Sequence, residues 1–159
     1  AVTPADRRAG DAIATSAGEL ARLWRTTRAQ ARPDVWPGLM DGLVDELFAR
    51  TGEALAAGRD PALLWPALVG VVRVDPRDAE RSRAELDEEW DLAEGVLTAA
   101  CDALGSGEAV REWIARAIVL ARAGARTLDA GGGPRGIVVV RWLSGLASAR
   151  RRERDAGRR

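Results

Sequence analysis

Three acidic residues of one predicted helix have types and spacing that could do chemistry. Asp87, Asp91 and Glu94 are four and three positions apart, so they share one stripe of a helix. Carboxylates held close together can raise the pKa of one of them for acid–base catalysis, or can bind a hard divalent cation. Metal sites in helix bundles usually add Glu-x-x-His pairs, and this chain has no histidine. We therefore favour a solvated or arginine-paired face over an enzyme site, and expect no bound metal.

The usual nucleophiles and bases are scarce. The chain has no histidine, lysine or tyrosine, and Cys101 is its one cysteine. Cys101 falls on an apolar helical stripe, which favours a core residue over a nucleophile. Ser16, Ser82 and Ser106 stand at predicted helix starts, and none lies in a Gly-x-Ser-x-Gly turn. Ser–His and Cys–His hydrolase chemistry is therefore excluded for this chain alone, and we expect no bound cofactor.

Six tryptophans are spread along the chain, about one for each predicted helix: Trp24, Trp36, Trp65, Trp90, Trp113 and Trp142. Four of them are candidates for lining a pocket that binds a small apolar molecule, namely Trp36, Trp65, Trp90 and Trp113. Their helical spacing also suits core anchors at helix crossings, and we favour that interpretation.

The stretch "GGGPRG", residues 131–136, raises the question of a phosphate-binding loop. A P-loop needs a lysine and a preceding strand, and neither is predicted here. Pro134 suits the first position of a new helix, and Arg135 with exposed N–H groups could hold an anion. We predict a Gly/Pro joint between two helices.

The segment 137–152 follows this joint. Its run of Ile137 and three valines prefers a strand, but the apolar pattern continues at helical spacing and a lone strand in a bundle would lack a partner. We therefore predict an apolar C-terminal helix of the same domain or of a dimer interface. The candidate interaction residues are Ile137, Val138, Trp142, Leu143 and Leu146.

Arginines surround this segment, and residues 153–159 form a basic tail that we expect to be frayed. The candidates for contact with an anion or an acidic partner are Arg135, Arg141, Arg150, Arg151 and Arg152. The tail has no interleaved aromatic residues, so nucleic-acid binding is not favoured.

Positioning of all these residues depends on helices. Capping residues, prolines and glycines divide the chain into about six helical segments. We predict starts at Thr3 and Ser16, a helix from Asp34 to Gly58, a broken helical segment over 62–74, and helices over 83–104 and 106–128. The fold class is therefore all-α: a single-domain bundle with residues 1–130 as its core.

Composition and charge fit a globular protein of one domain. Apolar residues make up 47% and charged residues 30% of the 159 positions. No apolar run is long enough to span a membrane and no signal pattern is recognised, so we expect a cytoplasmic protein. Residues 34–112 hold 18 acids and 7 arginines, whereas residues 113–159 hold 11 arginines and 3 acids. The acidic middle either folds against basic ends or presents an acidic face to a partner.

The helix "SRAELDEEWDLAEGVLTAACDAL" within such a bundle resembles, over residues 35–128, the globin-fold, haem-free sensor domains of stressosome regulators. The resemblance concerns the arrangement of helices and assigns no role to any residue. Because the chain has no histidine, a histidine-ligated haem is excluded. We expect a non-catalytic regulatory or scaffolding module that acts through protein–protein contact, with a homodimer as the first partner. The alternatives are a small-molecule-sensing bundle with a Trp-lined pocket, and a carboxylate-based or metal-dependent enzyme.

Overall fold

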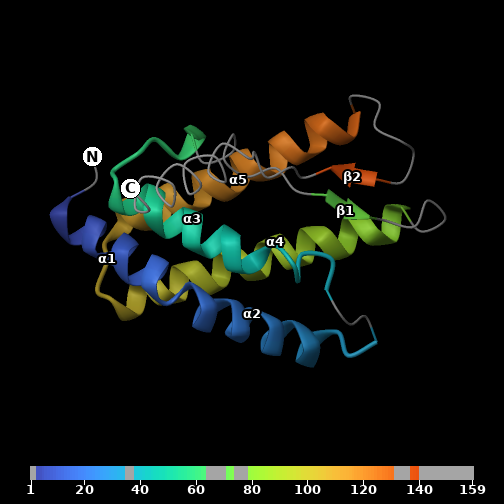
Figure 1. The fold of residues 1–159 in the computed structure, drawn as a ribbon, viewed down its shortest axis with the longest axis horizontal. Helices are drawn as coiled ribbons and strands as arrows, with labels where there is room; N and C mark the ends of the chain where they lie inside the picture. The colour runs from blue at the N-terminus through green and yellow to red at the C-terminus, as the bar shows by residue number, and fades with distance from the viewer. Residues whose placement is uncertain (1–2, 35–37, 64–70, 74–78, 131–136, 140–159) are drawn as a thin grey trace, which may run out of the picture.

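The computed structural model describes residues 3–34, 38–63, 71–73, 79–130 and 137–139 (Figure 1). Most of this part is helical, as the sequence predicts. The described elements are α1 (Pro4–Thr15), α2 (Ala17–Ala31), α3 (Val44–Ala56), the single 3-10 turn η1 (Pro61–Leu63), β1 (Val71–Arg73), α4 (Ala79–Ala103), α5 (Glu108–Ala130) and β2 (Ile137–Val139). None of the described helices is long and apolar enough to cross a membrane.

The first helix begins at the predicted cap. Thr3 Oγ1 accepts a hydrogen bond from Asp6 N at 3.2 Å, and Thr3 N donates to Asp6 Oδ2 at 2.9 Å. These bonds lower the pKa of the Asp6 carboxyl. The second predicted start is also present, because α1 ends at Thr15 and α2 begins at Ala17. Ser16 makes no side-chain cap bond there, so the break rests on backbone geometry alone.

Helices α1 and α3 lie side by side and make the most extensive contact between two described elements (Figure 1). Two glycines allow this approach. A Cβ on Gly10 would lie 2.8 Å from Gly52 O and would overlap the backbone of Ala56. A Cβ on Gly52 would lie 2.7 Å from Gly10 O and would overlap the backbone of Ala14. The pairing of Gly10 with Ala56 and of Gly52 with Ala14 shows that the two helices run antiparallel.

Helices α4 and α5 form a long antiparallel hairpin behind this pair (Figure 1). Gly105, with φ of 71°, follows the end of α4, and Gly58, with φ of 64°, follows the end of α3. Both glycines are the helix stops that the sequence predicts. All five helices contribute to one core cluster, whose largest fully buried side chains include Trp24, Phe48, Ile13, Met40 and Leu97.

Two predicted helix starts are wrong. Helix α3 begins at Val44 rather than after Asp34, because residues 39–43 form turns. Helix α4 begins at Ala79, so the Ser82 capping box lies inside the helix instead of at its start. With five α-helices in the described part of the chain, the expected number of about six is not confirmed, and the joint at 131–136 lies outside that part.

A short antiparallel ribbon replaces two stretches that were predicted to be helical. Strand β1 falls in the segment 62–74, and β2 occupies the predicted start of the C-terminal helix. The register pairs Val72 with Val138 and Arg73 with Ile137. The β-branched run at 137 therefore follows its intrinsic preference, since the two valines of β1 belong to a partner strand that the sequence pattern did not reveal. The ribbon lies where α4 begins and α5 ends (Figure 1).

Candidate functional site

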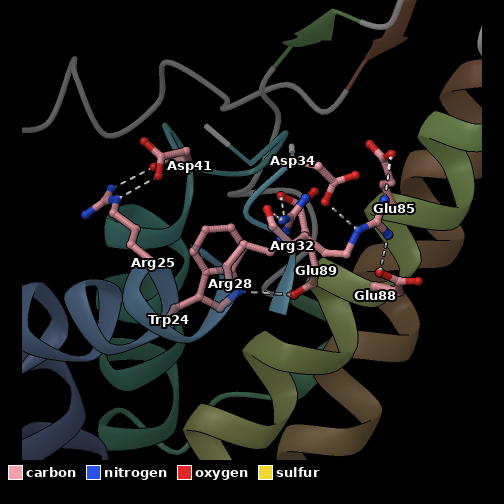
Figure 2. Close-up of polar contacts among 9 residues, drawn as sticks. All are labelled: Trp24, Arg25, Arg28, Arg32, Asp34, Asp41, Glu85, Glu88 and Glu89. Atoms are coloured by element: carbon pink, nitrogen blue, oxygen red, sulfur yellow. Dashed lines mark hydrogen bonds and ion pairs between the residues drawn. The ribbon is translucent and has the colours of Figure 1, made fainter. Parts of the chain in front are cut away.

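Two arginines of α2 and the arginine that follows its last residue face acidic residues of α4 and of the segment between α2 and α3. Arg25, Arg28 and Arg32 are three and four positions apart, so they lie on one side of the helix. Figure 2 shows Arg25 directed toward Asp41, and Arg28 and Arg32 directed toward the acidic residues of α4. We call these three arginines and their acidic partners the α2 arginine cluster.

Arg28 and Glu89 form the buried centre of this cluster. Arg28 Nε lies 3.4 Å from Glu89 Oε1, and the two side chains are 3% and 0% exposed. Neither carboxylate oxygen of Glu89 has a hydrogen bond of good geometry to any described residue. The Glu89 carboxyl is therefore held out of water beside Arg28 without a well-formed hydrogen bond from a described residue, which is costly for the charged form unless the two charges stabilise each other.

Burial dominates the electrostatics of this carboxyl. It raises the pKa of Glu89 from the ordinary 4.5 to about 7, because the charged form loses its hydration. The positive charge of Arg28 and the backbone amides of Met40 and Leu39 oppose that shift, while the negative charge of Glu85 adds to it. Glu89 is thus partly protonated near neutral pH.

The surroundings of Glu89 are tightly packed. Trp24 Nε1 donates a hydrogen bond to the main-chain oxygen of Glu89 at 3.2 Å (Figure 2). Gly38 sits directly on the carboxylate, since a Cβ at this position would overlap Glu89 Oε1 and lie 3.1 Å from the Trp24 ring. Residues from α2, α4 and the segment before α3 therefore meet at one carboxyl group.

The outer arginines make more solvent-exposed pairs. Arg25 Nε lies 3.1 Å from Asp41 Oδ1, and the same guanidinium also contacts Asp45. These partners raise the pKa of Arg25, the Asp45 hydrogen bond most strongly. Arg32 reaches three acids at 3.2 to 3.5 Å, namely Asp34, Glu85 and Glu88. Basic residues near the N-terminus thus neutralise part of the acidic middle of the chain.

The predicted acid stripe is engaged by an arginine of α5. Arg122 Nη2 pairs with Asp91 Oδ1 and donates to the main-chain oxygen of Asp87 at 2.8 Å. Asp91 is exposed, and Asp87 and Glu94 are partly buried. In the described part of the chain, no three His, Cys, Asp or Glu side chains are grouped closely enough to hold a metal ion.

Two of the four candidate pocket tryptophans belong to the core cluster. Trp90 and Trp113 are 4% and 7% exposed, and Trp113 Nε1 donates to the main-chain oxygen of Arg59 at 3.0 Å. Cys101 is buried in the same cluster, and burial raises the pKa of its thiol to about 11, which keeps it protonated. Trp36 and Trp65 lie outside the described residues.

The candidate interaction residues are described only in part. The backbone of Ile137 and Val138 belongs to β2. The remaining candidates lie outside the described residues: Trp142, Leu143, Leu146, Arg135, Arg141, Arg150, Arg151 and Arg152.

The Arg28–Glu89 pair was not predicted from the sequence, although a signal for it exists. Arg28 follows Trp24 by four positions, and Glu89 lies between Leu86 and Ala93 at helical spacing, so each charge stands on an apolar stripe. A charged residue at such a position must find a buried partner.

The cluster can hold a proton or a charge inside the molecule. No protein-family model, curated protein or solved structure matches the chain.

Proposed function

We propose that this chain is a non-catalytic helical module that acts through protein–protein contact and that associates first with its own copy. The observation that carries the proposal is the two-stranded ribbon. Its strands pair antiparallel, and five of its six residues are apolar: Val71, Val72, Ile137, Val138 and Val139.

A ribbon of this size needs support from elsewhere. Two strands of three residues each are marginal on their own, and strands of this kind are stabilised by a further strand or by a packed helix. Here β2 contacts α5. Edge strands also offer backbone N–H and C=O groups to a strand of another chain. Pairing between the ribbons of two copies would satisfy those groups and bury the apolar segments that contain Ile137 and Val138.

Sedimentation velocity over a concentration series tests this association. We expect the wild-type chain to shift toward a dimer as concentration rises. The double variant Ile137→Lys/Val138→Lys should remain monomeric, because charges on an edge strand oppose pairing. Val119→Lys is the matched control, since Val119 is 61% exposed on α5 and lies outside the ribbon.

Circular dichroism of each variant establishes that the helices remain. A wild-type chain that stays monomeric at every concentration would contradict the proposal. So would a folded Ile137→Lys/Val138→Lys variant that associates as strongly as the wild type.

A further inference from the structure

The segment 38–43, which precedes α3, lies against α4 at Glu89. It contains turns rather than helix, held by Asp41 N donating to Gly38 O at 3.1 Å and Leu43 N donating to Met40 O at 2.8 Å. Gly38 packs on the Glu89 carboxylate, and Met40 is buried in the core cluster. The segment therefore covers a carboxyl group that has no access to water while the segment is in place.

We propose that Glu89 acts as a proton-operated latch, which holds residues 38–43 against α4 while it is neutral and releases them when it loses its proton. The latch has a geometric basis: a fully buried side chain, one ion pair at 3.4 Å and no well-formed hydrogen bond from a described residue to either carboxylate oxygen. An ionised carboxyl in that place is poorly solvated, so moving the cover aside to admit water stabilises the charged form.

The charges that face Glu89 come from two described helices. Arg28 of α2 attracts its charge, and Glu85 of its own helix α4 repels it. The segment 38–43 contributes the amides of Leu39 and Met40, and its one acid, Asp41, is paired with Arg25. The remaining charges nearby are occupied, since Arg32 pairs with Glu85, Glu88 and Asp34, and Arg122 of α5 pairs with Asp91.

The direction of the pH response follows from the pKa of Glu89 in the two states. It is about 7 with the segment closed and near the ordinary 4.5 when water reaches the carboxyl. The closed state therefore binds the proton more tightly. The stabilisation of the closed state by protonated Glu89 is fully present below about pH 4.5 and is lost as pH rises through about 7. Higher pH therefore favours opening.

Amide hydrogen exchange of residues 38–43, with each rate divided by the intrinsic exchange rate at that pH, measures the opening. Between about pH 5.5 and about pH 8.5 we expect the opening equilibrium of the wild type to increase about 30-fold. Glu89→Gln, which mimics the neutral carboxyl, should remove that dependence. Glu88→Gln is the matched control, because it removes an exposed neighbouring charge and should keep the wild-type response.

Breaking a buried pair can unfold a protein, so a second variant is included. Arg28→Met/Glu89→Gln removes both charges and should also show opening that is independent of pH. Peptides from the α1–α3 contact should not follow the opening of the segment.

The proposal is wrong if the corrected amide exchange of residues 38–43 in the wild type does not change with pH. It is equally overturned if the single variant Glu89→Gln or the double variant Arg28→Met/Glu89→Gln keeps the wild-type pH response. Opening of the segment only together with α1 and α3 would also overturn it.

Discussion

The Arg28–Glu89 pair shows how two charges can be kept in an apolar core. Each residue alone would carry a buried charge, and such a charge costs several kcal/mol even after the protein relaxes. Together they lie 3.4 Å apart at a place where α2, α4 and the segment before α3 meet. The attraction offsets part of the cost, and the raised pKa of Glu89 shows that burial still outweighs it.

Removing one partner of this pair should therefore be costly. Above the pKa of Glu89 we expect Arg28→Met to lower the free energy of unfolding by about 3–5 kcal/mol, because the charged carboxylate then has no buried countercharge. Urea denaturation at about pH 8.5 measures the loss. Arg111→Met is the control: Arg111 pairs with Asp102 at 2.7 Å, but both side chains are nearly half exposed, so its midpoint should barely move. An equal loss in free energy of unfolding in the two variants would contradict the expectation that the buried pair stabilises the fold more than the exposed pair does.

Single residues were predictable where local rules decide their role. Cys101 lies in the core as expected, and Asp91 has the arginine partner that its stripe suggested. Arg28 and Glu89 were not predicted, because the helical spacing of the apolar residues around them does not show that these two charges are buried. Their partnership joins positions 61 residues apart in the chain, which no local pattern contains.

The contact between α1 and α3 depends on the small residues of two Gly-x-x-x-Ala sequences. Gly10 with Ala14, and Gly52 with Ala56, recur once per helical turn, so the smallest side chains stand at the crossing. Helix propensity alone counts a glycine inside a helix as destabilising. In the structure Gly10 is buried and allows the two backbones to meet.

Adding one methyl group at this contact should be destabilising. We expect Gly10→Ala and Gly52→Ala each to lower the free energy of unfolding by about 1–3 kcal/mol, since the new Cβ meets backbone atoms that cannot rotate away. Gly95→Ala on α4 is the matched control. Gly95 is exposed with no atom near its Cβ position, so alanine should stabilise the helix by about 0.5–1 kcal/mol. Thermal or urea unfolding compares the three variants, and a stabilising Gly10→Ala would refute the close contact.

Helix ends were predicted more reliably than helix starts. Gly58 and Gly105 stop helices by adopting positive φ, a property of the residue itself. Starts depend on which of several caps the packed chain uses, and neither Asp34 nor Ser82 begins a helix. The strand at Ile137 was missed for a similar reason, because its partner β1 lies more than 60 residues earlier in the chain.

One continuous core joins the five described helices. Core residues come from each of them, so the loss of one contact should be felt throughout the bundle. The distribution of charge supports the same arrangement. Arginines of α2 and α5 pair with acids in the segment 34–112, which agrees with the interpretation that the acidic middle folds against basic ends.

Cys101 provides a direct test of this cooperativity. It is the one thiol of the chain, it is fully buried, and its pKa of about 11 leaves little thiolate near pH 8. A thiol reagent should therefore label it only when the core opens. When the core opens and closes faster than the reagent reacts, the labelling rate is proportional to the fraction of open molecules. The rate then rises about tenfold for each 1.4 kcal/mol lost from the free energy of unfolding.

Gly52 lies in α3 and Cys101 lies in α4. If the core unfolds as one unit, Gly52→Ala should speed the labelling of Cys101. The factor should be the one calculated from the measured loss in free energy of unfolding. Gly95→Ala should slow the labelling by the corresponding factor. If Gly52→Ala leaves the labelling rate of Cys101 unchanged, α4 opens independently of the α1–α3 pair. The bundle would then contain two separate folding units.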